Sequence, residues 1–331
     1  STQVGALATT QVAALSATNV GALSTTQLGG LSSTQLASVT NTGLSALDAT
    51  QVAALTTTQV RGLTTTQIRS LSTTDFAELT STQIGALTST QISGISAANL
   101  SAMDATTVGV LSTTQLQGLS TIQLVGLTST DIGDFSSTQI AGLTSTQLGS
   151  LTATTFSALD ATQVSGLSST QVRGLSSGQV AALTETDIGE LTSTQITGLT
   201  PTQLSALSTT SLSALDATQM GALSGTQLRG MSTTQVRALS TTDIGELSTT
   251  QIGALTSTQM GALTTTVISA LTTTQMTGLS TTQIPGLTTT QIDYLSTTNI
   301  SALSFSQAEA FTTTQVQSLD NDQIVAYLNI T

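Results

Sequence analysis

Acidic side chains are the groups in this chain whose spacing could do chemistry. Of its 17 Asp and Glu residues, twelve fall into three columns in which the sequence number rises by 56 from one member to the next. The columns are Asp48, Asp104, Asp160 and Asp216; Asp75, Asp131, Asp187 and Asp243; and Glu78, Asp134, Glu190 and Glu246. Members of the second and third columns stand three residues apart, so on a helix they would form like-charged pairs on one face. If successive members of a column stack in space, these pairs build one acidic stripe.

An acidic stripe of this kind can take Ca²⁺, an arginine-rich partner surface, or only water. The candidate residues are Asp75, Glu78, Asp131, Asp134, Asp187, Glu190, Asp243 and Glu246. Calcium is the weaker choice, because the chain lacks the Gly-rich nonapeptides of calcium-binding β-helices. Arg61, Arg173 and Arg229 also share a column, with Gln117 in the gap. We therefore favour a lateral contact between the acidic stripe of one copy and the arginine column of another, over the simpler alternative of a solvated charged face.

The chain lacks most side chains that catalysis and cofactor binding require. It contains no Cys and no His, which excludes thiolate nucleophiles, imidazole bases, and zinc, haem and iron–sulfur sites with their usual ligands. We therefore predict that it is not an enzyme and that it has no catalytic residue and no cofactor. The net charge of -12 disfavours nucleic acid and anionic lipid as partners. No run of about 18 apolar residues occurs, so we also predict no membrane insertion.

One octapeptide unit, seen in Ser248–Leu255, recurs from end to end and must position all of these residues. With Thr250 as position 1, Gln stands at position 2, Val, Ile or Leu at position 3, small residues at 4 and 5, Leu at 6, and Ser or Thr at 7 and 8. An unbroken period of this kind predicts one solenoid rather than several domains. The small residues at positions 4 and 5 indicate that a neighbouring coil approaches closely there.

A short helix that restarts in every octad fits this unit best. A continuous helix turns by about 100° per residue, so its apolar seam would rotate by about 80° in each octad. A single strand would point positions 3 and 6 to opposite faces. In Ser248–Gln251 the Ser side chain can cap the Gln amide while the Gln side chain returns to the Ser amide, and Asp48, Asp160 and Asp216 take the cap place in other octads. We predict an all-α solenoid or superhelix of very short helices, one per octapeptide, with a β-solenoid as the alternative.

The interval between members of an acidic column equals seven octads and is a second period of the chain. The octad before each capping Asp replaces Gln at position 2 and carries Ser at position 4. The position-2 residues of these octads and of the octad one further interval along are Gly43, Asn99, Thr155, Ser211 and Val267. Two explanations remain open. Either the gene duplicated a block of seven octads, which needs no structural meaning, or seven octads make one turn of the solenoid and so stack equivalent residues.

The octad register also defines the organisation of the chain. It holds over residues 1–303 without a linker, and we predict that this stretch is one octapeptide-repeat solenoid. Residues 304–331 depart from the consensus and are predicted to be degenerate capping repeats at the C-terminal end. Phe305, Phe311 and Tyr327 in this segment are candidates to cover the open end or to contact another molecule.

The phrase Leu-Ser/Thr-x-x-Gln-Val-x-x-Leu resembles the first helix of TAL-effector repeats, over a single octad per unit. The second helix and the base-reading residue pair of that family are missing, so the resemblance implies a helix but not DNA binding. The whole array resembles the long repeat regions of large bacterial surface and adhesin-like proteins. Because an unsatisfied terminal coil also propagates head to tail, we expect a structural, self-assembling extracellular protein, a filament subunit or a rigid stalk, whose partner is itself. The alternative is a Thr-rich ice-binding solenoid.

Overall fold

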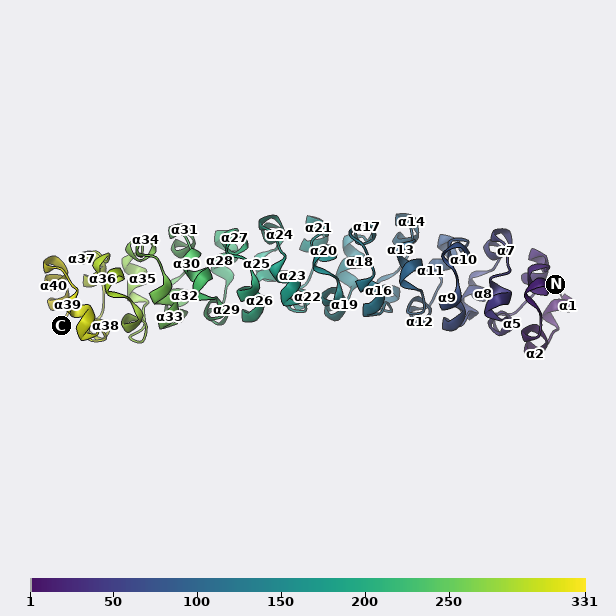
Figure 1. The fold of residues 1–331 in the computed structure, drawn as a ribbon, viewed down its shortest axis with the longest axis horizontal. Helices are drawn as coiled ribbons and strands as arrows, with labels where there is room; N and C mark the ends of the chain where they lie inside the picture. The colour runs from purple at the N-terminus through teal and green to yellow at the C-terminus, as the bar shows by residue number, and fades with distance from the viewer. Residues whose placement is uncertain (1) are drawn as a thin grey trace. The chain divides into compact units, whose positions relative to one another are not determined.

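The architecture is a coil of very short helices. The computed structural model describes residues 2–331, so Ser1, where the predicted repeat region begins, lies outside the described residues. Those residues form 40 α-helices and one 3-10 helix, and no strand occurs among them. The chain divides into two compact units, Ser1–Leu167 and Ser168–Thr331, and within each the helices follow one another around a coil (Figure 1). The predicted all-α solenoid is confirmed and the β-solenoid alternative is wrong.

The helices recur once per octad in both units. The first unit contains α1 (Thr2–Gly5), α2 (Thr9–Ala13), α3 (Ala17–Gly21), α4 (Thr25–Leu28), α5 (Ser33–Ser38), α6 (Asn41–Leu44), α7 (Ala49–Ala53), α8 (Thr57–Gly62), α9 (Thr65–Ser70), α10 (Thr73–Ala77), α11 (Ser81–Gly85), α12 (Ser89–Ile92), α13 (Ala97–Ser101), α14 (Ala105–Gly109), α15 (Thr113–Leu116), α16 (Thr121–Val125), α17 (Ser129–Gly133), α18 (Ser137–Gly142), α19 (Ser145–Ser150), α20 (Ala153–Phe156) and α21 (Ala161–Ser165). The second contains α22 (Ser169–Arg173), α23 (Ser177–Ala181), α24 (Glu185–Glu190), α25 (Ser193–Ile196), α26 (Pro201–Ala206), α27 (Thr209–Ser213), α28 (Ala217–Ala222), α29 (Gly225–Gly230), α30 (Thr233–Ala238), α31 (Thr241–Gly245), α32 (Thr249–Ala254), α33 (Ser257–Ala262), α34 (Thr265–Ser269), α35 (Thr273–Thr277), η1 (Ile284–Gly286), α36 (Thr289–Asp293), α37 (Thr297–Ser301), α38 (Phe305–Ala308), α39 (Thr313–Gln317) and α40 (Asn321–Leu328).

The consensus octad shows why each helix starts and stops where it does. At the start of α32 the Gln251 amide donates to Ser248 Oγ at 3.3 Å, and the Ser248 amide donates to Gln251 Oε1 at 2.9 Å. This is the predicted capping box, which satisfies two of the free amides at the helix N-terminus. Leu255 then leaves the helix with extended backbone angles (φ -60, ψ 146). The chain is thereby redirected, and Thr256 caps the next helix.

Aspartate and proline modify this pattern as their chemistry predicts. Asp48 Oδ1 accepts the Gln51 amide at 2.8 Å, so the Asp residues of the first column are helix caps. Pro201 occupies the first turn of α26, where a missing N–H costs nothing. Pro285 lies later in its octad, where the missing donor matters. That octad forms the 3-10 helix η1 in place of an α-helix.

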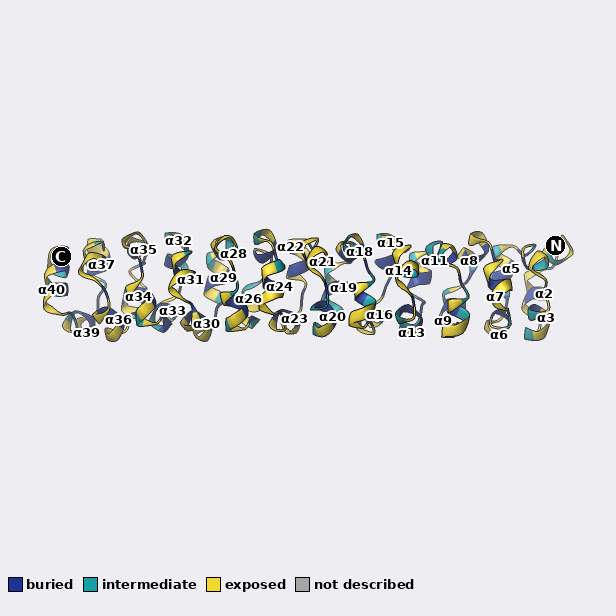
Figure 2. Cartoon of the chain, turned by 90° about the horizontal axis from the view of Figure 1, so that it is seen from above, coloured by how far each residue is buried: buried dark blue, intermediate teal, exposed yellow. Residues whose placement is uncertain are grey.

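The core of each unit is the aliphatic seam at positions 3 and 6. Ile252 is 0 % exposed and Leu255 is 3 % exposed, and their equivalents in most other octads are buried to a similar degree. Buried residues recur in every turn while Ser, Thr and charged residues occupy the outer surface (Figure 2). The two apolar side chains of an octad are therefore shared between neighbouring octads.

Successive turns are joined by the glutamine at position 2. Gln251 Nε2 donates to the Met220 carbonyl at 3.0 Å and to the Leu223 carbonyl at 2.9 Å. These carbonyls lie 31 and 28 residues earlier, at the C-terminal end of α28. Helix α32 meanwhile packs against α29, three octads earlier. Each helix therefore lies over the gap between the helices that precede it by three and by four octads. We call this series of bonds between turns the glutamine ladder.

The ladder bonds fix the length of one turn of the coil. The bond from Gln251 to the Leu223 carbonyl spans 28 residues, which is three and a half octads. The predicted seven octads per turn is therefore wrong. Because a turn ends on a half octad, position 2 of one turn lies over position 6 of the turn beneath it. Equivalent positions return to the same side and register only after two turns, so the seven-octad period is two turns of the coil and does have a structural meaning.

In several octads the glycine at position 5 is required by the packing of turn on turn. A Cβ atom at Gly278 would meet the Thr249 carbonyl oxygen at 2.7 Å, and one at Gly62 would meet the Ser33 carbonyl oxygen at the same distance. At position 4 the result is mixed, because a Cβ at Gly253 would clash with the Gly278 carbonyl whereas one at Gly245 would meet nothing within 4 Å. The predicted close approach is therefore confirmed in some octads at both positions and absent in others, since position 5 also holds larger residues such as Glu78 and Val110.

The inter-turn hydrogen bonds predict a specific effect for Gln251→Glu. The carboxylate keeps an acceptor for the cap amide but has no hydrogen to donate, and it faces two carbonyl oxygens. We expect a loss of about 2–4 kcal/mol in the free energy of unfolding at neutral pH, measured by urea denaturation followed by circular dichroism.

The matched control is Gln11→Glu. Gln11 returns to the cap amide of Ala8 at 2.8 Å, but it is exposed and no turn of residues 2–331 lies beneath it. This variant changes the charge by the same amount and should leave the stability of the dilute protein within about 0.5 kcal/mol of the parent. Equal losses from the two variants would show that the donor function of Gln251 is unimportant.

Candidate functional site

The second acidic column occupies the place of the ladder glutamine. Asp75, Asp131, Asp187 and Asp243 all stand at position 2. The Asp243 carboxylate accepts the Ser240 amide at 2.7 Å, and the Asp243 amide donates to Ser240 Oγ at 3.2 Å. Each aspartate therefore preserves the capping box of its own helix. None has the amide hydrogens with which glutamine holds the turn beneath.

The third column lies beside both other columns. Burial raises the pKa of Glu78, and the carboxylates of Asp75 and Asp48 raise it further. Burial raises the pKa of Glu246 in the same way, followed by Asp243 and Asp216. Asp48 and Asp216 precede the glutamates that they influence by slightly more than one turn, so they belong to the turn beneath. The coil thus gathers three carboxyl groups, one from each column, into one cluster.

The acidic pairs of the second and third columns do not stack on successive turns as the predicted acidic stripe requires. Successive members of a column lie two turns apart, so the pairs of columns two and three occupy every second turn. In the first unit the first column falls in between, since Asp104 lines one cavity together with Thr73, Phe76 and Ala77 of α10, one turn earlier. Asp131 follows the Asp104 cap by about one further turn. The acidic side of the unit therefore alternates between a capping Asp and an acidic pair.

A hydroxyl group also enters this cluster. Ser101, at position 4 of the octad that precedes the Asp104 cap, donates from Oγ to Asp131 Oδ2 at 2.7 Å. The same carboxylate oxygen accepts the Thr128 amide at 2.8 Å. This contact gives one member of the recurrent position-4 serines a function that the sequence did not indicate. Glu246 lacks such a donor, because its buried Oε2 has no hydrogen-bond partner.

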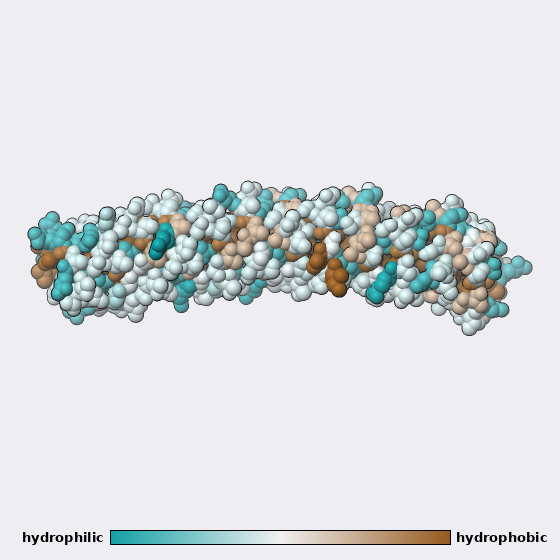
Figure 3. Space-filling model, viewed as in Figure 1, coloured by the Kyte–Doolittle hydropathy of each residue, from teal (hydrophilic) through white to brown (hydrophobic). Residues whose placement is uncertain are grey.

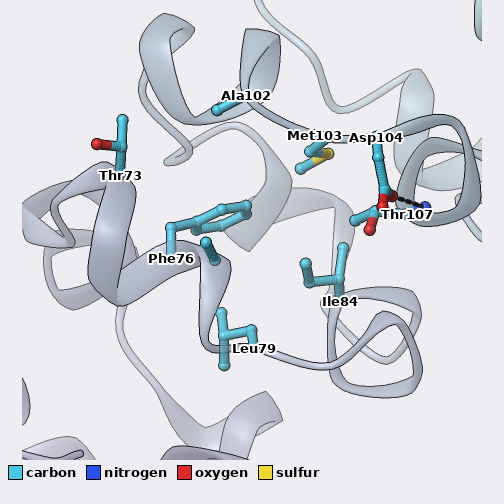
Figure 4. Close-up of a pocket in the computed structure, with 9 residues that line it drawn as sticks. Thr73, Phe76, Leu79, Ile84, Ala102, Met103, Asp104 and Thr107 are labelled. Carbon is cyan, nitrogen blue, oxygen red and sulfur yellow. Dashed lines mark hydrogen bonds between the residues drawn. The ribbon is translucent and has the colours of Figure 1, made fainter. Parts of the chain in front are cut away.

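The pKa of Asp104, a helix cap of the first column, is shifted in the opposite direction to the pKa values of Glu78 and Glu246. The side chain and the backbone amide of Thr107 donate to Asp104 and hold the pKa of its carboxyl group below the ordinary value. The amide contact is 2.8 Å long and is drawn in Figure 4. Hydrogen bonding thus lowers the pKa of Asp104, whereas burial raises that of Glu78.

Nothing in the described residues supports the calcium alternative. Within residues 2–331 no three Asp or Glu side chains converge in a way that could hold a metal ion. Arg61, Arg173 and Arg229 are exposed and lie in the last turns of α8, α22 and α29, where a positive charge suits the helix end. Their pairing with the acids of another copy stays a prediction.

The C-terminal aromatic residues are only partly brought together. The rings of Phe311 and Tyr327 meet edge to face, with centroids 5.8 Å apart and planes at 63°. Phe311 is buried, whereas Phe305 is 56 % exposed and does not join this contact. Helix α40, at eight residues, is the longest in the described chain. Its Val325 and Leu328 are 60 % and 64 % exposed.

A missing ladder glutamine leaves a cavity beside Asp104. The cavity has a volume of about 140 Å³ and is lined by Phe76, Leu79, Ile84 and Met103, with Asp104 and Thr107 at its polar side (Figure 4). Thr107 stands at position 2, but its hydroxyl donates to Asp104, the cap of its own helix, rather than to the carbonyls of Phe76 and Leu79 in the turn beneath. Seven octads further along, Gln163 does reach the equivalent carbonyls of Ile132 and Phe135. The cavity is therefore the volume that a glutamine side chain fills elsewhere.

The ladder itself is the functional feature that the sequence analysis missed. Position 2 was interpreted only as the acceptor of the capping box, for which glutamate is equally suitable. The signal was present, because no octad of the chain has Glu at position 2. A preference for Gln over Glu indicates that the amide hydrogens are needed as donors.

The fold and the ladder define a class, the all-α solenoids built from octapeptide repeats. In agreement with this, the chain matches the family model of the ALTTAQ repeat at residues 57–89, 212–249, 230–265, 257–289 and 268–305. The matched segments together cover less than half of the chain, and they confirm a repeat region similar to that family. No curated protein matches the chain. None of the helices in residues 2–331 has the length and hydrophobicity that a membrane span requires.

The cavity predicts that Thr107→Gln stabilises the first unit. The longer side chain fills the volume beside Met103 and adds donors for the carbonyls of Phe76 and Leu79. We expect a gain of about 1–2 kcal/mol in the free energy of unfolding. Thr106→Gln, at an exposed neighbouring position, serves as the control and should change stability by less than about 0.5 kcal/mol. A loss of stability in Thr107→Gln, or an equal effect of both variants, would contradict this explanation of the cavity.

The raised pKa of Glu246 predicts a pH-dependent effect of Glu246→Gln. A carboxyl group whose pKa is higher in the folded than in the unfolded chain stabilises the fold below its ordinary value of 4.5 and loses that contribution as pH rises through the folded value. The variant should therefore gain thermal stability at neutral pH and little below pH 4.5. Thermal melts at both pH values test this, with the exposed Glu185→Gln as control. The explanation fails if the two variants give the same pH profile.

Proposed function

We propose that the chain is a structural protein of the cell exterior that assembles with copies of itself, as a filament subunit or as the rigid stalk of a surface protein. The observation that carries this proposal is the direction of the glutamine ladder. Every turn donates amide hydrogens to the turn before it and offers carbonyl groups to the turn after it. A turn without a neighbour on one side has unmatched donors or unmatched acceptors.

The first and the last turn of the described residues both expose groups that are buried in the turns between them. In the turn of residues 2–28, Gln3 and Gln11 are exposed, although glutamines at the same position are buried further along. Leu7 and Leu15 are only half-buried there. In the last turn, Val325 and Leu328 leave apolar surface in contact with solvent. Wherever a coil of this kind ends, a donor face with an open apolar seam fits an acceptor face with the same register, and such a heterologous contact propagates as a fibre.

The surface composition supports a structural function outside the cell. The outer face carries Ser and Thr at positions 8 and 1, acids, few arginines and no lysine. Figure 3 shows one face on which most residues are near neutral hydropathy, with only isolated strongly apolar side chains. Such a surface gives little nonspecific attraction to nucleic acid or anionic membranes.

Ice binding is the alternative function for a Thr-rich repeat. It has less support, because many position-7 hydroxyls are used as helix caps, as Ser248 is, and because the exposed Thr residues stand on short helices rather than on a flat sheet. Thermal hysteresis from the monomeric protein at micromolar concentration would favour ice binding over assembly.

The assembly proposal is tested by removing the donors of the first turn. The triple variant Gln3→Glu, Gln11→Glu and Gln27→Glu keeps capping acceptors but would set carboxylates against the carbonyls of a docked copy. We expect the parent to form head-to-tail oligomers or fibres in electron micrographs, and the variant to associate at least about tenfold more weakly by sedimentation.

The control places the same charges on the side of the coil, at the exposed positions Thr58→Glu, Thr74→Glu and Thr234→Glu. It should assemble like the parent after a small correction for charge repulsion. A parent that stays monomeric at high concentration, or a donor variant that assembles as well as the control, would overturn the proposal.

A further inference from the structure

The glutamine ladder shows how this coil binds a primary carboxamide. Seven octads after the Asp104 cap, the Asp160 amide donates to Gln163 Oε1 at 2.8 Å. Gln163 Nε2 donates in turn to the carbonyls of Phe135 and Ile132, at 2.6 Å and 3.4 Å. Gln163 is only 3 % exposed, so its aliphatic stem is buried as well. One donor from the start of its own helix and two acceptors from the turn beneath therefore hold each carboxamide of this kind.

The octad of Thr107 keeps the acceptors but has no glutamine. The ladder register is intact on both sides of it, since Asn99 and Gln115 each donate to a carbonyl 28 residues earlier. The same register sets the Leu79 carbonyl beneath Thr107, but the Thr107 hydroxyl donates to Asp104 instead. Leu79, Asp104 and Thr107 all line the cavity of about 140 Å³. A carbonyl that elsewhere accepts a carboxamide therefore borders this cavity without its usual donor.

The cavity has the size and the apolar lining that a small amphipathic molecule needs. The side chains of Phe76, Ile84 and Met103 point into one space from different segments of the coil (Figure 4). A cavity of this volume holds a molecule of about six non-hydrogen atoms. Thr73 and Ala102 also line it and are exposed, so a solute can enter from the surface.

We propose that this cavity is a binding site for a small primary carboxamide with a short aliphatic chain. The NH₂ group of the ligand donates to the Leu79 carbonyl, as a ladder glutamine does in other turns. Its carbonyl oxygen accepts the Asp104 amide, which corresponds to the Asp160 amide at Gln163. Its aliphatic chain lies against Phe76 and Met103. The ligand thereby completes one missing contact of the glutamine ladder, and the site does not depend on assembly of the protein.

The polar groups at the cavity select a carboxamide over charged molecules of the same shape. A carboxylate has no hydrogen for the Leu79 carbonyl, and the Asp104 carboxylate repels it. The donors of Thr107 hold the pKa of Asp104 below its ordinary value, so this repulsion is present at neutral pH. An alkylammonium ion can donate to the Leu79 carbonyl but cannot accept the Asp104 amide. Selectivity among such molecules therefore reports on the hydrogen-bond pattern of the ladder.

The methionine methyl groups allow a direct test by NMR titration. The chain has five Met residues, of which Met103 lines the cavity. The other four lie in the second unit and serve as internal controls: Met220, Met231, Met260 and Met276. The probes are butyramide, butyrate and butylammonium at neutral pH. Butyramide should shift the Met103 signal with a dissociation constant in the millimolar range, and the two ions should bind at least about tenfold more weakly.

The variant Thr107→Gln supplies the carboxamide from the chain itself and should weaken butyramide binding at least about tenfold. Thr106→Gln, at the exposed neighbouring position, is the matched control and should bind like the parent. Circular dichroism confirms that both variants are folded, and the comparison of the three probes on the parent needs no variant.

Three results would overturn the proposal. The first is a Met103 signal that does not respond to butyramide up to about 100 mM, or that moves no more than the signals of the other methionines. The second is butyrate or butylammonium binding as tightly as butyramide, which would show that the ladder pattern does not select the ligand. The third is equal binding of butyramide by Thr107→Gln and Thr106→Gln, which would place the bound molecule outside the cavity.

Discussion

A single side chain, the glutamine at position 2, holds the structure together in two directions. Its carbonyl oxygen accepts the amide that opens its own helix, and its NH₂ group donates to the carbonyls at the end of a helix one turn earlier. The partners of Gln251 are Ser248, which contributes an amide and a hydroxyl to the capping box, and the carbonyls of Met220 and Leu223. Helices this short leave nearly all of their terminal amides and carbonyls without partners inside the helix. One buried glutamine per octad satisfies the groups that such short helices cannot satisfy themselves.

This constraint explains where the chain tolerates variation. Asparagine, threonine and serine at position 2 give up the return to the cap amide but keep the bond to the turn beneath, as Asn99 and Ser211 do. Aspartate at position 2 has the opposite effect. Its carboxylate still accepts the amide of the helix cap, but it has no amide hydrogen to donate to the turn beneath. These two kinds of substitution occur in separate octads of each seven-octad block. Most octads have a glutamine that makes both contacts, and octads with a weakened cap or with a weakened inter-turn contact are set between them.

The local part of this architecture could be predicted from the sequence, and the long-range part could not. The capping box, the helix bounds around Ser248–Leu255 and the effect of Pro285 follow from residues within one octad, for which the chemistry is local. The number of octads per turn depends on how far the chain turns at each extended Leu, such as Leu255, and no residue within one octad fixes that angle. The seven-octad period was visible, but it could arise from one turn or from two. Only the contacts of Gln251 with Met220 and Leu223, 31 and 28 residues earlier, distinguish them.

The same contact explains why the turn must contain a half octad. If a turn held a whole number of octads, each helix start would lie over another helix start, and the glutamine amide would face a capping hydroxyl rather than a helix end. With three and a half octads, position 2 lies over positions 3 and 6 of the turn beneath, where carbonyl groups accept the amide hydrogens of the glutamine. The half octad thus places the N-terminal end of a helix over the C-terminal end of a helix in the turn beneath. Along one side of the coil, helix N-termini and helix C-termini therefore alternate from turn to turn. A sequence period of seven octads is the shortest one that respects this alternation, because it contains two complete turns. The acidic columns follow the seven-octad period for the same reason. An aspartate of the first column, which caps a helix, and an aspartate of the second column, at position 2, come close only because neighbouring turns are displaced by half an octad.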